Sequence, residues 1–244
     1  MVVPRAEAEI ARARLLELAP RGFEEVERGG RIELAVYAHE GAEELLREAF
    51  PEASSTPVEP GWDERWREFH RPVSAGGLWI GPPWEPTPAG QDAVVIDPGR
   101  AFGTGAHPTT RLCVELLAAE ERGSVLDAGC GSGVLAVAAA RLGFGPVLAV
   151  DADETAVSCA RENAALNGVA LDVRLADVLE DELPVTDLVV ANIELGVVEA
   201  LLPRLPGPRA ITSGYLAGEV PVAPGWAPVD ERQLDGWAAH VLAS

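Results

Sequence analysis

The stretch SVLDAGCGSGVLAVAAARLG, residues 124–143, constrains the fold more than any other part of the sequence. An apolar strand pattern runs into three glycines, Gly129, Gly131 and Gly133, and an alanine-rich helix pattern follows. A turn this tight needs residues without a Cβ, and the helix after it offers unpaired backbone N–H groups at its start. The stretch therefore predicts a strand, a ligand-binding turn and a helix in an open α/β sheet.

The chain around this stretch alternates between strand and helix patterns. After a strand in AVVIDPG, we predict helices over 108–121, 133–142, 154–167 and 194–202, and strands over 124–128, 146–151, 170–175, 186–192, 209–213, 226–232 and 236–243. Such alternation predicts a Rossmann-like α/β domain, with a mostly parallel seven-stranded sheet covered on both faces. The segment LAGEVPVAPG, before the last two strands, is too rich in proline and glycine for a helix. One sheet face is therefore expected to be thinly covered there, or covered by another chain.

The first 58 residues predict a small ferredoxin-like α+β domain of order β-α-β-β-α-β. Its signals are a helix over 5–19, a hairpin around Gly29-Gly30, a helix over 41–50 and a short strand within 52–60. The next stretch, 59–72, predicts a connector helix with Trp62, Trp66 and Phe69 on one side. The predicted domains are therefore 1–58, the connector 59–72 and a catalytic domain 73–244.

Three aspartates follow successive elements of the predicted sheet. Asp127 stands two residues before Gly129, where a carboxylate suits an ammonium group better than a phosphate. Asp151 ends the second strand, where it can accept both hydroxyls of a ribose, and Asp177 follows the third strand, within reach of an adenine amino group. Together they predict an S-adenosylmethionine site of the class I methyltransferase type. The alternative is a doubly wound domain whose glycine turns bind no nucleotide.

Asn192 ends the strand 186–192, on the side of the sheet where a ligand binds in open α/β folds. The sequence there is Asn192-Ile193-Glu194-Leu195, without the paired prolines and aromatic residue that would stack on a planar base. A flexible amine, such as a lysine side chain or an α-amine, fits better. We expect Asn192 to orient that amine and water to carry its proton away, while Glu194 could simply begin the next helix.

The stretches DPGRAFGTGAHPTT, DAGCGSGVLAVAAARLG, VDADETAV and DLVVANI, in this order, resemble the ribosomal protein L11 methyltransferases (PrmA type). The resemblance implies methyl transfer from S-adenosylmethionine to lysine side chains and the N-terminal amine of that protein, which the front domain would recognise. It implies cofactor contacts from Thr110, Gly129, Asp151 and Asn192, with the loop Phe102, Gly103 and Thr104 over the methionine part. Pro108 would begin the helix that carries Thr110, and His107 is expected to brace the loop rather than act as a base.

Composition bears mainly on partners and compartment. The formal net charge is −20 and the chain contains no lysine, which favours a basic protein partner over nucleic acid. The three cysteines are odd in number and widely spaced, which predicts reduced thiols in a cytoplasmic protein and no metal site. No signal peptide or membrane span is recognisable in the sequence, and a monomer is expected.

Two alternatives to this function remain open. One is a class I methyltransferase with another substrate, such as the electron-transfer flavoprotein β subunit, on which a related group acts, or a small-molecule amine. The other is a module that binds S-adenosylmethionine without transferring the methyl group.

Overall fold

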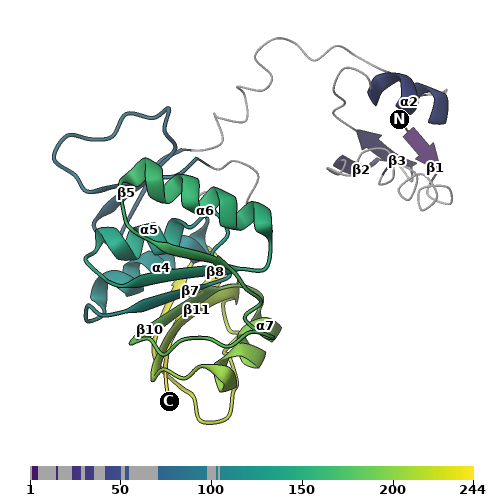
Figure 1. Ribbon diagram of the computed structural model, residues 1–244. Coiled ribbons are helices and arrows are strands. Elements are labelled where there is room, and N and C mark those ends of the chain that lie inside the picture. The colour runs from purple at the N-terminus through teal and green to yellow at the C-terminus, as the bar shows by residue number, and fades with distance from the viewer. Residues whose placement is uncertain are drawn as a thin grey trace. The chain divides into compact units, whose positions relative to one another are not determined.

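The computed structural model describes residues 2–4, 15, 24–28, 31–35, 42–50, 53–54, 71–97, 103 and 105–244. The chain divides into two compact units, Met1–Trp62 and Asp63–Ser244 (Figure 1). The predicted connector 59–72 lies outside the described residues except for its last two positions.

The N-terminal unit contains a small antiparallel sheet and a helix. Its strands β1 (Val2–Pro4), β2 (Glu24–Arg28) and β3 (Arg31–Ala35) pair in the order β1-β3-β2, and helix α2 spans Ala42–Ala49. The hairpin predicted around Gly29-Gly30 is confirmed, because Arg28 pairs with Arg31. Leu15, Ile32 and Leu34 form its buried core. The predicted helix 5–19, apart from residue 15, and the final strand within 52–60, apart from residues 53–54, lie outside the described residues.

The larger unit is built on a seven-stranded sheet in the order β12-β13-β11-β10-β7-β8-β9. Its strands are β7 (Val125–Ala128), β8 (Val147–Asp151), β9 (Asp172–Leu175), β10 (Leu188–Asn192), β11 (Arg209–Leu216), β12 (Ala227–Leu234) and β13 (Trp237–Ala243). The five strands from β11 to β9 in this order run parallel, and β13 and β12 add an antiparallel edge. This architecture confirms the predicted Rossmann-like fold.

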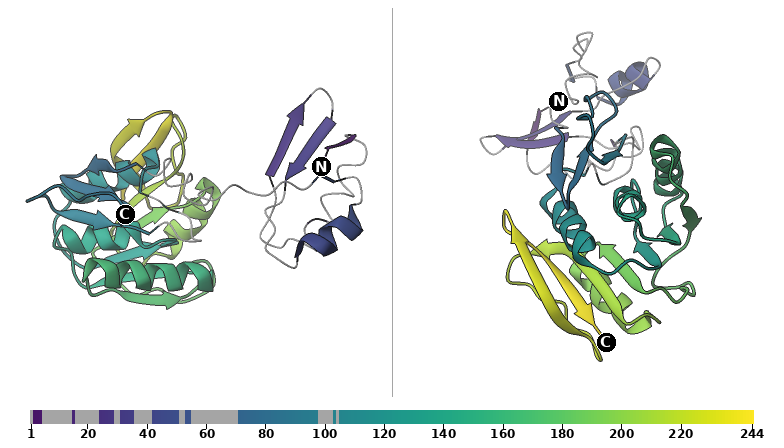
Figure 2. Two further views of the ribbon diagram at one scale, coloured as in Figure 1. Left: turned by 90° about the horizontal axis from the view of Figure 1, so that it is seen from above. Right: turned by 90° about the vertical axis from the view of Figure 1, so that its left-hand side faces the viewer.

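Helices cover both faces of the sheet (Figures 1 and 2). Helices α4 (Pro108–Ala119), α5 (Val134–Arg141) and α6 (Glu154–Asn167) pack on one face and bury the larger hydrophobic cluster. Helix α7 (Leu195–Leu201), followed by a 3-10 turn over Leu202–Arg204, packs on the other face. Both faces of the central strands are therefore buried, as a parallel sheet requires.

A second, three-stranded sheet precedes α4 in the chain. It consists of β4 (Val73–Ala75), β5 (Leu78–Gly81) and β6 (Ala93–Val95). The strand in AVVIDPG is confirmed as β6, whereas the β4–β5 hairpin over Gly76-Gly77 was not predicted. Its strands of three and four residues are too short to give a periodic signal.

The connection between β11 and β12, residues 217–226, contains no helix, as the prolines and glycines of LAGEVPVAPG (216–225) predicted. It partly covers the α7 face of the sheet with Ala223 and Trp226. Val222 of this segment is 77% exposed and so adds nothing to that cover.

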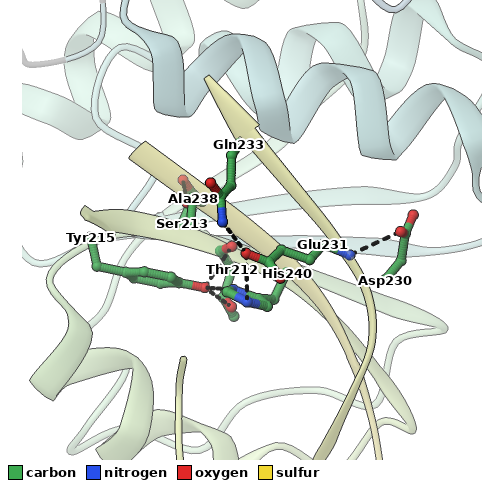
Figure 3. Close-up of polar contacts among 8 residues, drawn as sticks. All are labelled: Thr212, Ser213, Tyr215, Asp230, Glu231, Gln233, Ala238 and His240. Atoms are coloured by element: carbon green, nitrogen blue, oxygen red, sulfur yellow. Dashed lines mark hydrogen bonds and ion pairs between the residues drawn. The ribbon is translucent and has the colours of Figure 1, made fainter. Parts of the chain in front are cut away.

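A polar cluster of Thr212, Tyr215, Glu231 and His240 lies on the neighbouring strands β11, β12 and β13 (Figure 3). The Tyr215 hydroxyl lies 2.8 Å from Thr212 Oγ1 and 3.0 Å from His240 Nδ1, and the two rings stack. His240 is 1% exposed, and its Nε2 lies 3.9 Å from Glu231 Oε1. Burial holds the pKa of His240 below its usual range, and the Glu231 charge partly opposes this shift.

Candidate active site

The predicted glycine turn connects the end of β7 to the start of α5 and rests on β8. The N–H groups of Gly129 and Cys130 both donate to the Val150 carbonyl at 2.9 Å. The turn needs glycine for two reasons, its backbone conformation and the space around it. Gly129 and Gly133 have φ of +76° and +79°, and protein atoms crowd the space that a Cβ would take. At Gly129 that atom belongs to Ile193, 2.7 Å away, and at Gly133 to Ala160, 2.9 Å away.

Asp127 is the penultimate residue of β7, just before the turn, and is only 1% exposed. Its Oδ2 accepts the Ala136 N–H at 2.9 Å and so neutralises the positive start of α5. Its Oδ1 has no hydrogen-bond partner among the described residues. Burial raises the pKa of this carboxyl to about 7; the Ala136 bond opposes the shift and the Asp151 charge adds to it. The free oxygen is a buried acceptor for a donor or a cation, and it disfavours phosphate.

Asp151 ends β8 with its carboxylate against the glycine turn. One oxygen accepts the Gly131 N–H at 2.9 Å and the other accepts the Asp153 N–H at 3.0 Å. A carboxylate has about four acceptor positions, so two remain for a ligand. The side chain is partly exposed, which leaves it accessible to ribose hydroxyls.

Asp177 lies past the end of β9, next to the end of β8. The preceding residue, Ala176, donates its N–H to the Asp151 carbonyl at 2.9 Å. The Asp177 side chain is exposed and its Oδ1 accepts the Leu179 N–H at 2.8 Å, which stabilises a turn. The structure therefore places Asp177 after β9, as predicted, and gives its side chain a local structural bond.

Thr110 and Asn192 lie together, although 82 positions separate them in the chain. Asn192 Nδ2 donates to the buried Thr110 Oγ1 at 3.4 Å. Asn192 ends β10, which pairs with β7, so it emerges next to the glycine turn. The backbone beyond it is fixed as well, because Ile193 N–H donates to the Ser213 carbonyl at 3.1 Å.

Pro108 occupies the first turn of α4, as predicted, and His107 is the N-cap residue. The His107 Nδ1 lies 2.7 Å from Thr109 Oγ1, and the ring packs edge-on against Trp237 at 4.8 Å between centroids. His107 therefore caps the start of α4 and is held against Trp237. This arrangement fixes the start of the helix that carries Thr110.

The first glycine segment, residues 97–110, meets the glycine turn at one described point. Ser132 Oγ donates a hydrogen bond to the Gly103 carbonyl. Phe102 and Thr104, the neighbours of Gly103 in the predicted cofactor loop, lie outside the described residues.

The cysteines are free thiols, as predicted. Cys113 and Cys130 are buried, and burial together with the nearby Asp127 charge raises the pKa of both. They therefore stay protonated. Within the described ranges, no group of three or more His, Cys, Asp or Glu could hold a metal. No helix among the described residues is both long and apolar enough to cross a membrane.

Sequence reasoning missed three polar residues that connect these segments: Ser132, Asn163 and Asn167. All three side chains are buried. The available signal was the pair of asparagines four positions apart in RENAALNG, which places both on one face of α6.

Comparison with known proteins decides the family. The family model for ribosomal protein L11 methyltransferase (PrmA) matches residues 33–220. The chain belongs to this family. The match ends inside the segment 217–226, so β12 and β13 lie beyond it.

Two curated relatives carry the name ribosomal protein L11 methyltransferase. The protein from Symbiobacterium thermophilum is 42% identical over 199 residues, covering 74% of this chain and 65% of its own length. The protein from Exiguobacterium sibiricum is 38% identical over 201 residues, which cover 75% of this chain and 64% of that protein. The match thus spans just under two thirds of the length of these relatives.

A solved structure supports the same family. The crystal structure of a ribosomal protein L11 methylase from Lactobacillus delbrueckii subsp. bulgaricus has a TM-score of 0.64 and 29% sequence identity. The likeness covers 71% of this chain and 98% of that one.

Proposed function

We propose that this chain is an S-adenosylmethionine-dependent protein N-methyltransferase. Its proposed substrate is ribosomal protein L11, methylated on lysine side chains, the N-terminal amine or both. The names of the relatives support this substrate. The observation that carries the proposal is the contact of Asn192 with Thr110 beside the glycine turn, at the carboxyl ends of β7 and β10. Ligands of open α/β sheets bind at this edge.

The residues present fit the cofactor. The partly exposed Asp151 carboxylate keeps acceptor positions for ribose hydroxyls. The unpartnered Asp127 Oδ1 favours a positively charged ligand over a phosphate. When bound, S-adenosylmethionine supplies a methyl group already activated by its sulfonium. The protein therefore has to position the reactants more than to activate them.

Asn192 is the proposed catalytic residue, because its carboxamide can accept a hydrogen bond from the substrate amine and aim the lone pair at the methyl group. A free lysine amine has a pKa of about 10.4, so it must lose a proton before it reacts. Burial in a dry site favours its neutral form. Bound S-adenosylmethionine would supply the methyl group to this nitrogen, and the proton that the amine releases would pass to water. We assign His107 a structural role, because its Nδ1 contacts Thr109 at the cap of α4 and its ring packs against Trp237.

The roles of the different parts of the chain are also a proposal. Residues 1–58 would recognise the substrate protein, 59–72 would connect, and 73–244 would carry out the transfer. A net charge of −20 suits a basic protein partner. It also argues against direct binding of nucleic acid. We further propose that the enzyme acts as a monomer in the cytoplasm.

The test is to incubate the chain with labelled S-adenosylmethionine and unmethylated ribosomal subunits, and to locate the label by mass spectrometry. Label in ribosomal protein L11 is the expected result. Label only in another protein, such as the electron-transfer flavoprotein β subunit in a cell extract, or in a small amine would refute the substrate. Binding without transfer would refute the activity.

Two variants test the assigned roles. Asp151→Ala should weaken cofactor binding at least tenfold, because a carboxylate contributes about 1.5–3 kcal/mol per hydrogen bond. Asn192→Ala should lower kcat at least tenfold while the cofactor Kd changes less. Full turnover by Asn192→Ala would remove its orienting role.

A further inference from the structure

We propose that Asn163 and Ser132 are positioning residues for the cofactor. They hold Asp97 and Gly103, two points of the first glycine segment, against the glycine turn. The inference rests on the proposed function, because it assumes that both segments face the same ligand. The sequence patterns alone indicated no role for either side chain.

Asn163 bridges two backbone segments from the middle of α6. Its Oδ1 accepts the Asp97 N–H at 2.9 Å, and its Nδ2 donates to the Asp97 carbonyl at 3.2 Å. The same Nδ2 donates to the Ser132 carbonyl at 2.9 Å. Asn163 is 2% exposed, so these bonds are shielded from competing water. One carboxamide thus binds both the start of the first glycine segment and the glycine turn.

Only a carboxamide fits this place. The site presents two carbonyl oxygens and one N–H, and an asparagine offers two donor hydrogens and one acceptor oxygen. An aspartate of the same shape would place its charge against both carbonyls, and an alanine would leave all three groups without this partner.

Ser132 makes the second connection. It is fully buried inside the glycine turn, and its hydroxyl donates to the Gly103 carbonyl. The approach is close, since a Cβ on Gly103 would lie 3.0 Å from the Ser132 hydroxyl oxygen. The two glycine-rich segments are therefore joined directly here, and indirectly through Asn163.

Asn167 shows what a purely structural asparagine does in the same helix. One turn beyond Asn163, it accepts the Val95 N–H at 2.8 Å and donates to the Val95 carbonyl at 2.6 Å. It also donates to the Asn163 carbonyl at 2.8 Å. It is 6% exposed and forms no bond with the glycine turn. Asn167 is thus a matched control, with the same residue type, helix and pairing mode.

The advantage of these bonds is preorganisation. Asp97 and Gly103 are about 30 residues away from the glycine turn in the chain. Without Asn163 and Ser132, the cofactor would have to order the two segments when it binds, and this ordering would weaken its affinity. The bonds make that arrangement part of the folded protein, so binding does not have to produce it.

The experiment compares Asn163→Ala, Ser132→Ala and Asn167→Ala in the full chain. The Kd for S-adenosylhomocysteine is measured by calorimetry, well below each thermal midpoint, and kcat is measured at saturating S-adenosylmethionine. Asn163→Ala and Ser132→Ala should each weaken binding on the order of tenfold. Asn167→Ala should lower the thermal midpoint about as much as Asn163→Ala, with a Kd within twofold of the parent. At saturating S-adenosylmethionine, kcat of all three variants should stay within threefold of the parent value.

Each other result overturns the inference. Equal weakening by Asn163→Ala and Asn167→Ala would mean that the asparagines act only through general stability. An unchanged Kd in Ser132→Ala, which removes one hydroxyl and is expected to fold if Asn163→Ala does not, would mean that the connection to Gly103 does not matter. If the parent chain bound no S-adenosylhomocysteine, the proposed function would fail as well. That outcome is distinguishable, because it appears before any variant is made.

Discussion

Replacing Asp127 by asparagine should stabilise the protein at alkaline pH and weaken its binding of the cofactor. The carboxyl is 1% exposed, and burial raises its pKa from 3.8 to about 7. The folded state therefore binds this proton more tightly than the unfolded state does. Stability is lost as pH rises from the unfolded pKa through the folded one, and no more is lost above it.

The magnitude follows from the two pKa values. A shift from 3.8 to about 7 corresponds to about 4 kcal/mol at a pH above both. Between pH 5 and pH 8, the parent should lose about 3 kcal/mol that the asparagine variant does not lose. An amide in place of Oδ1 brings an unpartnered donor, which costs about 1–3 kcal/mol at every pH. The comparison between two pH values removes this constant cost.

The assay is urea unfolding of parent and Asp127→Asn at pH 5 and pH 8, followed by near-UV circular dichroism. The free energy of unfolding of the variant should gain about 3 kcal/mol relative to the parent between the two pH values. If the free energies of unfolding of parent and variant changed between pH 5 and pH 8 by the same amount, within about 0.5 kcal/mol, the burial argument would be refuted.

The same substitution tests the role of this oxygen in the site. Asparagine carries no charge to attract a cationic ligand, so S-adenosylmethionine should bind more weakly to the variant at pH 8. At pH 5, where the parent carboxyl is protonated in the free protein, the difference should shrink. An affinity unaffected at both pH values would show that Oδ1 does not face the cofactor.

Two further predictions concern the sheet behind the site. Gly214 has φ of +105°, and a Cβ there would lie 2.2 Å from the Ile193 carbonyl oxygen, so Gly214→Ala should displace the turn after Asn192 and lower kcat at least tenfold. Gly218→Ala is the control, since its φ is +93° but nothing lies within 4 Å; equal kcat loss in both would point to backbone strain alone. Burial lowers the pKa of His240, so stability should fall as pH drops below its usual pKa of about 6.5, and thermal midpoints at pH 7.5 and 5.5 should differ less in His240→Gln.

The fold was most predictable where local signals agree with tertiary packing. Helix α6 was predicted at its observed bounds, because Asp153 caps its start and Gly168, with φ of +63°, ends it. Helix α7 is one residue shorter than predicted at each end, because Glu194 is its N-cap and a 3-10 turn that contains Pro203 follows Leu201. Start and stop signals of helices come from neighbouring residues, so a single sequence reveals them.

The candidate site was predictable where topology brings residues together. Asp127, Asp151 and Asn192 follow from the rule that parallel strands end at one edge. Asn163 was not predictable, because it bonds to a residue 66 positions away. A buried asparagine and a solvated one look the same in sequence, and only the tertiary structure reveals the difference.

The position of β13 has a consequence for how the protein is made. This strand follows β11 and β12 in the chain, yet it lies between them in the sheet and pairs with both. Until the ribosome has released it, β11 has an open edge beside the finished parallel strands. An unpaired strand edge invites wrong contacts. Nascent chains should therefore need protection around β11, even though the candidate site residues Asp127, Asp151 and Asn192 have already emerged.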